Sequence, residues 1–127
     1  MSLVRVLLRN QFSCEMNDEG IPRKKFNKAI KEIISGLSDS LGHKLYKKRI
    51  GGLGRGKRGG YRGICYYRIN ELLIFVYLYP KNEKETLEDK EIKQLILLSR
   101  EYDKLNESKI QILVERNEFI DYNYIAD

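Results

Sequence analysis

Two strand-like segments separated by three residues constrain the fold more than any other feature of the sequence. Residues 72–79 are apolar throughout, which is typical of a strand buried on both faces. Residues 61–68 are rich in tyrosine and also predict a strand. Only Ile69, Asn70 and Glu71 lie between them. The two segments are therefore predicted to form a tight antiparallel hairpin, with the second strand in the centre of a sheet.

Further strands and helices are predicted around this hairpin. Short apolar segments predict strands at residues 3–8, at residues 44–50 as an edge strand, and at residues 119–125. After Pro22, apolar residues at helical spacing predict an amphipathic helix that ends near residues 36–42. Its lysines fall mostly on the other side of that helix: Lys24, Lys25, Lys28 and Lys31.

The C-terminal third predicts two more helices. Thr86 with Asp89 resembles a capping box that opens the first, and a short second helix near residues 107–116 buries Ile110, Leu113 and Val114. Together these elements predict an α+β domain in which a mainly antiparallel sheet has helices packed on one face. The opposite face is then expected to be open to a ligand.

Chain length and composition predict one domain over residues 1–127. The 127 residues are enough for one hydrophobic core, and the 42% hydrophobic content exceeds that of a disordered chain. No apolar run approaches the ~20 residues of a membrane span, and no signal peptide is recognisable at the start. The two cysteines lack C-x-x-C spacing, so neither a disulfide framework nor a zinc site is expected. A cytoplasmic location and no membrane contact are the expectation.

Positive charge is concentrated in one part of the chain. The net charge is +6, yet residues 40–70 contain no acid at all. That stretch carries nine of the 24 basic side chains, whereas acids and bases are interleaved after Glu83. A solvated surface usually mixes charges of both signs, so the distribution favours a polyanionic partner over a merely basic loop.

The glycine-rich segment 51–60 resembles two nucleotide-binding motifs without satisfying either. Residues 51–58 nearly match G-x-x-x-x-G-K-[ST], but Arg58 replaces the hydroxyl that would hold magnesium. A strand follows instead of a helix, which also excludes the G-x-G-x-x-G match. The segment instead offers flexible backbone carrying Arg55, Lys57 and Arg58 between strands that carry Arg49 and Arg62. Guanidinium groups there are suited to phosphate oxygens.

The remaining candidate residues give weaker signals. Alternation along residues 61–68 separates Tyr61 and Tyr67 from Arg62 and Tyr66, and one of these faces must be core. Tyrosines that share a face with the basic groups would be free to stack on bases. The single histidine, His43, has no ligand-spaced partners and is expected at the surface. No cofactor and no metal are expected.

Three segments in order resemble the RelE/HigB-type toxins of bacterial toxin–antitoxin modules, within the RelE/ParE superfamily. They are residues 46–50 (Y-K-K-R-I), 54–62 (G-R-G-K-R-G-G-Y-R), and 75–77 with 81–83 (F-V-Y and K-N-E). The similarity extends over nearly the whole chain. Arg58 stands where the most similar branch has serine, and Tyr79-Pro80 stands where that branch has Phe-Ala.

This resemblance implies a sheet of four to five strands with helices, and a cationic concave face for RNA. It implies cleavage of mRNA in the ribosomal A site without metal, and an antitoxin, of helix-turn-helix type in our prediction, that covers the cationic face. ParE-type relatives inhibit DNA gyrase instead, and fold alone does not choose between these activities. Two alternatives therefore stay open: a non-enzymatic toxin that poisons gyrase or blocks a nucleic-acid machine, and an inactive co-repressor acting with its antitoxin.

Spacing and the resemblance together suggest roles for individual side chains in attack by an RNA 2′-hydroxyl. Arginines at 49, 55 and 62 suit stabilisation of the phosphorane, because arginine stays protonated. Lys57 is the candidate for moving protons, and Tyr67, Tyr79 and Glu83 are further acid or base candidates. The predicted RNA-binding residues are Lys44, Lys47, Lys48, Arg58, Tyr61, Lys81 and Asn82. The general base, the cleavage specificity, the antitoxin and the oligomeric state are not predicted.

Overall fold

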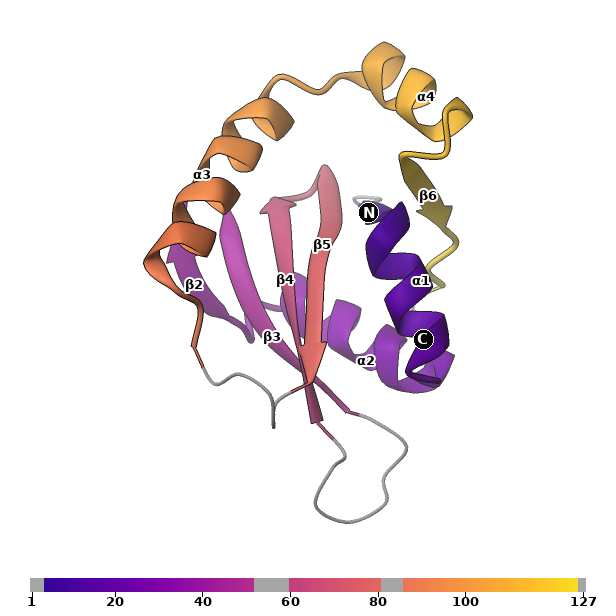
Figure 1. The fold of residues 1–127 in the computed structure, drawn as a ribbon. Helices are drawn as coiled ribbons and strands as arrows, with labels where there is room; N and C mark the ends of the chain where they lie inside the picture. The colour runs from indigo at the N-terminus through magenta and orange to yellow at the C-terminus, as the bar shows by residue number, and fades with distance from the viewer. Residues whose placement is uncertain (1–3, 52–59, 81–85, 126–127) are drawn as a thin grey trace.

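The computed structural model describes residues 4–51, 60–80 and 86–125. Their secondary structure alternates short strands with four helices (Figure 1). The elements are β1 (Arg5–Arg9), α1 (Asn10–Asp18), α2 (Arg23–Ile34), β2 (Asp39–Gly42), β3 (Leu45–Gly51), β4 (Gly60–Arg68), β5 (Leu72–Pro80), α3 (Asp89–Asp103), α4 (Glu107–Glu115) and β6 (Phe119–Tyr122). None of the helices in these ranges is long and apolar enough to cross a membrane.

All six of these strands form one sheet in the order β2-β3-β4-β5-β1-β6. The predicted hairpin is confirmed, since β4 and β5 pair antiparallel and β5 lies inside the sheet. Only β1 and β5 pair in parallel. The strand predicted at residues 44–50 is present as β3, but its edge position is wrong, because β2 pairs outside it. The sequence of β2, Asp-Ser-Leu-Gly, is short and mostly exposed, so it carries no strand periodicity.

The predicted α+β class with a mainly antiparallel sheet is confirmed, with six strands instead of four or five. The helices contribute to a hydrophobic core on each face of the sheet, not on one face only. Helices α1 and α2 bury Phe12, Phe26 and Ile30 on the first face. Helices α3 and α4 contribute Tyr102 and Ile110 on the second. In Figure 1, α2 crosses behind the strands while α3 and α4 arch along the other side.

Both faces need cover because β4 and β5 are apolar on both sides. Ile64 and Tyr66 of β4 face the α3–α4 core, whereas Cys65 and Tyr67 face the α1–α2 core. All four side chains are buried. Four successive residues of β4 are therefore core residues, whichever face they point to. The sheet is a central layer that is covered on both faces.

Helix boundaries depart from prediction at two places. Helix α1 was not predicted: its first turn has no acid, no side chain caps its N-terminus, and Phe12 is its one buried residue. The N-cap of helix α3 lies two residues later than the cap predicted at Thr86. The Glu91 carboxylate accepts a hydrogen bond from the Glu88 backbone N–H at 2.9 Å, so Glu88 and not Thr86 is the N-cap.

Candidate functional site

A row of three side chains crosses the sheet on the α3–α4 side. Arg49 of β3 lies directly opposite Arg62 of β4, and Arg62 lies directly opposite Tyr79 of β5. Side chains at directly opposed positions point to the same face. Tyr79 belongs to the core that α3 and α4 cover, which identifies that face. We call Arg49, Arg62 and Tyr79 the arginine row.

A small hollow lies at this row. It has a volume of about 230 Å³ and is lined by Asp39, Lys47, Arg49 and Arg62. Lys47 is two residues before Arg49 on β3 and therefore shares its face. Three cations thus surround one carboxylate in a space large enough to admit a phosphate group. Asp39 was not among the predicted site residues, because the strand that carries it was not recognisable in the sequence.

The cations of this hollow have one neighbouring acid, Asp39, and it forms no ion pair with any of them among the described residues. Among the described residues, Lys47, Arg49 and Arg62 take part in no ion pair and no side-chain hydrogen bond. Like charges at directly opposed positions of a sheet destabilise it. An anion held between the two guanidinium groups would remove this repulsion, and guanidinium donors match phosphate oxygens in pairs.

Tyr79 lies beside Arg62 but is largely covered. Its side chain is 4% exposed, and its ring centroid is 5.4 Å from that of Tyr77. The Tyr77 hydroxyl donates a hydrogen bond at 3.4 Å to the Glu91 carboxylate of α3. Through these contacts the first turn of α3 is held against the edge of the arginine row.

Two predicted site residues, Lys48 and Tyr67, lie on the opposite face of the sheet. The Lys48 ammonium is 3.0 Å from the Glu32 carboxylate and donates to the Leu37 carbonyl at 2.7 Å. It therefore fastens β3 to α2. Tyr67 is buried in the α1–α2 core, where its ring packs against Tyr46.

Tyr61 and Lys44 are also separate from the arginine row. The Tyr61 hydroxyl donates to the Glu19 carboxylate at 2.8 Å on the α1–α2 side, and this hydrogen bond raises the pKa of Tyr61. Lys44 directly precedes the first residue of β3, at the end of the strand away from the arginine row. Its ammonium is 3.1 Å from the Asp103 carboxylate. Of the eight predicted site residues that the structure describes, it brings together Lys47, Arg49, Arg62 and Tyr79.

The other predicted site residues lie outside the described ranges. They are Arg55, Lys57, Arg58, Lys81, Asn82 and Glu83. The described strands nevertheless fix where these two segments attach. β3 ends two residues after Arg49, β4 begins two residues before Arg62, and β5 ends one residue after Tyr79. All three ends are at the same end of the sheet as the arginine row.

The remaining candidates from the sequence are placed as follows. His43 is exposed in the turn between β2 and β3, with a positive φ of 56°. Cys14 is exposed and Cys65 is buried, and both are free thiols. Burial raises the pKa of the Cys65 thiol.

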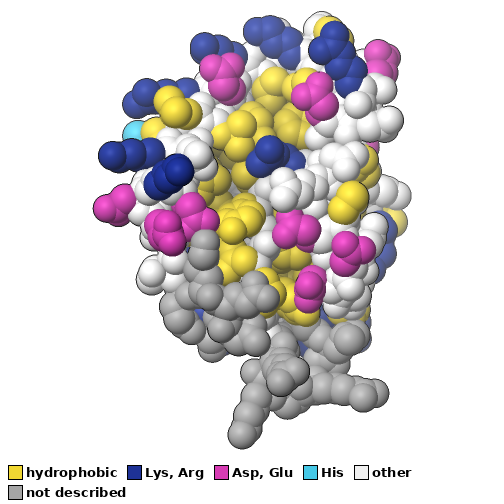
Figure 2. All heavy atoms as spheres, in the orientation of Figure 1, with side chains coloured by type: hydrophobic (Ala, Val, Ile, Leu, Met, Phe, Trp, Pro, Cys, Tyr) yellow, Lys and Arg dark blue, Asp and Glu magenta, His cyan; other side chains and the backbone are white. Residues whose placement is uncertain are grey.

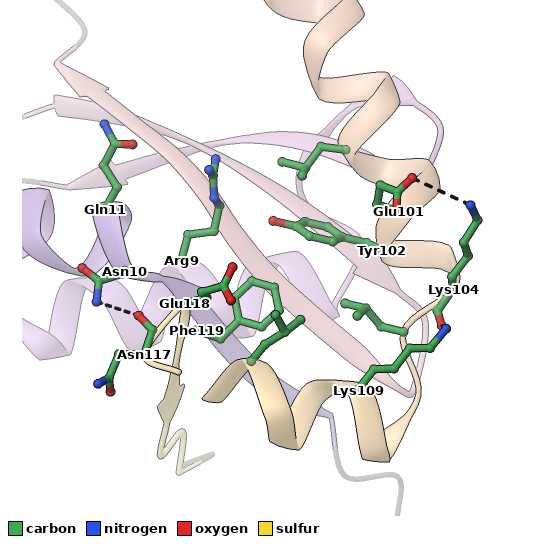
Figure 3. Close-up of a pocket in the computed structure, with 13 residues that line it drawn as sticks. Arg9, Asn10, Gln11, Glu101, Tyr102, Lys104, Lys109, Asn117, Glu118 and Phe119 are labelled. Carbon is green, nitrogen blue, oxygen red and sulfur yellow. Dashed lines mark hydrogen bonds and ion pairs between the residues drawn. The ribbon is translucent and has the colours of Figure 1, made fainter. Parts of the chain in front are cut away.

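A larger apolar groove of about 660 Å³ lies beside the sheet, between α3, α4 and the start of α1. Tyr102 and Phe119 form its floor, and Arg9 projects from the end of β1 into it (Figure 3). Burial raises the pKa of Tyr102 to about 12. A second hollow of about 300 Å³ shares Arg9, Gln11 and Leu98 with the groove and extends toward Tyr77. In Figure 2, hydrophobic side chains reach the surface on this side of the molecule between charged ones.

The sequence matches a family of known proteins. A model of the family described as "RelE toxin of RelE / RelB toxin-antitoxin system" matches residues 4–122. The match includes the arginine row, the apolar groove and all six strands of the sheet. No curated protein matches the sequence.

Proposed function

Because the chain belongs to the RelE toxin family, we propose that it inhibits translation by cleaving mRNA on the ribosome. The observation that carries this proposal is the directly opposed pair of Arg49 and Arg62, which has no carboxylate partner among the described residues. An anion bound between the two guanidinium groups would relieve this repulsion further than the single Asp39 carboxylate of the hollow does. The scissile phosphate of an RNA strand is the anion we assign to it.

The proposed reaction is attack by the 2′-oxygen on the adjacent phosphorus. The new P–O bond forms as the bond to the 5′-oxygen breaks, so the 2′-hydroxyl loses a proton and the 5′-oxygen gains one. The phosphorane between these events carries added negative charge. Arg62 is mounted between two paired strands, so its guanidinium group meets this charge with little rearrangement. Arg49 and Lys47 supply further positive charge from β3.

Proton transfer is assigned to residues at the same end of the sheet. Tyr79 is a candidate by position, since it is the direct neighbour of Arg62 on β5, but its hydroxyl is buried and would have to be uncovered to reach the substrate. Lys57 and Glu83 stay predictions, because they lie outside the described residues. Tyr67 is left out of the proposal, because its side chain is buried on the other face.

Dependence on the ribosome follows from the size of the hollow. The hollow is shallow in chemical terms, since only four described side chains line it, so it orients few atoms of the substrate. Orientation accounts for a large part of the rate of such reactions. We propose that the ribosome supplies it by presenting the mRNA strand in a fixed path.

The partner that the family description names is an antitoxin. We propose that it silences the toxin by covering the cationic face, and that the apolar groove next to this face contributes to its binding. The groove offers buried apolar area, and Arg9 offers a cation for a carboxylate of the partner. The helix-turn-helix class of the antitoxin stays a prediction from the sequence.

Cleavage of an mRNA during translation in a purified system tests the proposed activity. We expect cuts within the translated frame, detected by primer extension, and weak cutting of the same RNA without ribosomes. Chelator added after the ribosomal complex has formed should leave cleavage intact, within the limit set by ribosome integrity. Strong magnesium-dependent cutting of free RNA would contradict the mechanism. Inhibition of gyrase supercoiling without any mRNA cleavage would favour the gyrase alternative.

A further inference from the structure

Four lysines line the outer side of α2, on the far side of the sheet from the arginine row. The helix buries Phe26, Ala29, Ile30 and Ile33 against the sheet. Its exposed lysines are Lys24, Lys25, Lys28 and Lys31. Three of them, at positions 24, 28 and 31, follow one another along successive turns and therefore form a stripe. We call these four residues the lysine stripe.

No acid balances this stripe in the part of the chain that the structure describes. None of the four lysines forms an ion pair there, and the one acid of α2, Glu32, is bound by Lys48 of β3. Like charges on adjacent turns destabilise a helix by a few tenths of a kcal/mol per pair, roughly. Lys25 packs its side chain beside Gly51 of β3, where an added Cβ would lie 3.1 Å from the Lys25 Cδ atom. No described ion pair uses the charge of the four lysines, so this charge is available to a ligand.

The stripe forms one wall of a groove of about 780 Å³, and the C-terminal segment forms the other wall with Tyr124 and Ile125. That segment is held in place by contacts with α2. The Tyr122 hydroxyl donates to the Asn27 side-chain oxygen at 2.5 Å, and the Arg23 guanidinium lies 4.7 Å from the centre of the Tyr122 ring. The groove is thus a built feature with a fixed wall, and not a row of lysines on a flat surface.

We infer that this lysine groove binds a phosphate backbone of ribosomal RNA, as a second contact separate from the mRNA at the arginine row. The inference rests on the proposed function. Lysine binds phosphates as a point charge, whereas it is depleted at protein–protein interfaces. The sheet separates the two cationic surfaces, since α2 packs on one face and the arginine row lies on the other. A strand bound at the row does not reach α2, but a particle that surrounds the toxin contacts both.

Two triple variants with the same change of charge test the inference. The first is Lys24→Gln, Lys28→Gln and Lys31→Gln, which keeps side-chain length and helix propensity. The control is Lys90→Gln, Lys93→Gln and Arg100→Gln on α3, three exposed cations outside both cationic surfaces. Each protein is labelled at the exposed thiol of Cys14, and its folding is checked by thermal melting. Its anisotropy is then measured with vacant ribosomes over a range of potassium chloride at constant magnesium.

We expect the α2 triple variant to bind vacant ribosomes more weakly than wild type. The slope of log K against log salt should become shallower by about 2, which corresponds to three lost phosphate contacts. The control triple should keep the wild-type slope. If wild type and the α2 triple variant show equal slopes of log K against log salt while mRNA cleavage is intact, the inference is wrong but the proposed function stands. Unchanged ribosome binding with lost antitoxin or operator DNA binding would overturn it too, by assigning the groove to that partner. If the wild-type protein neither binds ribosomes nor cleaves mRNA, the proposed function itself is wrong.

Discussion

Arg62 lies on a strand that is hydrogen-bonded to a neighbouring strand on each side, and it has a pairing partner on both of them. β3 pairs with it at Arg49 and β5 pairs with it at Tyr79. The next residue, Gly63, packs against Ile50, since an added Cβ would lie 2.8 Å from the Ile50 Cδ1 atom and that side chain would have to shift. The backbone that carries Arg62 is therefore closely packed. A guanidinium on such a support is suited to a charge that develops only in the transition state.

Replacement of Arg62 should reduce cleavage far more than it reduces stability. We expect Arg62→Ala to lower the rate of mRNA cleavage by about 100- to 1,000-fold, as loss of one fixed donor typically does. Arg62→Lys should also be impaired, because it keeps the charge but loses the paired donors. The exposed Arg100 of α3 provides the control, since Arg100→Ala should cleave like wild type. A folded Arg62→Ala protein that still arrests growth and translation would disprove the assignment.

Replacing each of two neighbouring cations on β3 by glutamine should change the free energy of unfolding in opposite directions. Arg49→Gln removes a like-charge contact with Arg62 and should raise the free energy of unfolding by about 0.2–1 kcal/mol. Lys48→Gln removes the contacts with Glu32 and the Leu37 carbonyl and should lower it by about 1–2 kcal/mol. Urea titrations of the three proteins measure both changes. A loss of stability in Arg49→Gln would mean that Arg49 has a structural partner after all.

Single residues of the site were only partly predictable from the sequence. Alternation placed Arg62 and Tyr67 on opposite faces of one strand, which is confirmed. It did not reveal that both faces are core, so Tyr67 remained a candidate acid or base. The role of Lys48 depends on Glu32, a residue 16 positions earlier that only the tertiary structure brings near. Pairings of this kind have no signal in local sequence patterns.

At the scale of elements, a polar network fixes the end of α3 on the sheet. The Tyr66 hydroxyl donates to the Asp103 carboxylate at 2.6 Å, and Lys44 pairs with the same carboxylate. Arg68 donates to the Tyr102 carbonyl at 2.8 Å. These contacts hold the last turn of α3 over β3 and β4. They set the position of the helix that closes one side of the apolar groove.

Asp103→Asn should weaken this attachment in a pH-dependent way. The hydrogen bond from Tyr66 lowers the pKa of Asp103, with a further contribution from Lys44. A carboxyl with a lowered pKa stabilises the fold fully above its unfolded-state pKa of about 4, and this stability is lost as the pH falls through the folded-state pKa. We expect Asp103→Asn to lose about 1 kcal/mol at pH 7, a small value because the carboxylate is 43% exposed. The difference from wild type should shrink in melts below pH 4, and a constant difference would exclude the ionic contribution.

Elements with strong periodicity were predicted, and elements without it were not. The hairpin, α2 and α3 follow from long apolar patterns, and the structure confirms them. Helix α1 has one buried residue, and β2 has none, so neither has a pattern to recognise. The cap of α3 was misplaced because Glu88 acts where Thr is the more usual residue. Local propensity was overridden there by the chain's path into the helix.

At the scale of the whole molecule, strands far apart in the sequence close the sheet. β1 pairs in parallel with β5 and antiparallel with β6, and Arg5 binds Asp121 across that edge at 2.7 Å. The sequence predicted β1, β5 and β6 as strands but gave no information on their order. This order separates the molecule into two faces. The arginine row lies on one of them, and the lysine stripe lies over the other.

This separation predicts that the two cationic surfaces act independently in ribosome binding. The Debye length is about 8 Å at physiological salt, so charges on opposite sides of a packed sheet are largely screened from one another. Substitutions at such sites usually add within about 0.5 kcal/mol. We therefore expect the binding losses of Arg49→Gln with Arg62→Gln and of the α2 triple variant to sum in the combined protein. Anisotropy at constant salt measures all three variants against wild type, with ribosomes that carry an mRNA lacking the 2′-hydroxyl at the A-site codon, so that the arginine row meets an uncleaved strand. A combined loss well below the sum would show that both surfaces contact the same stretch of RNA, which the placement of the sheet between them does not allow.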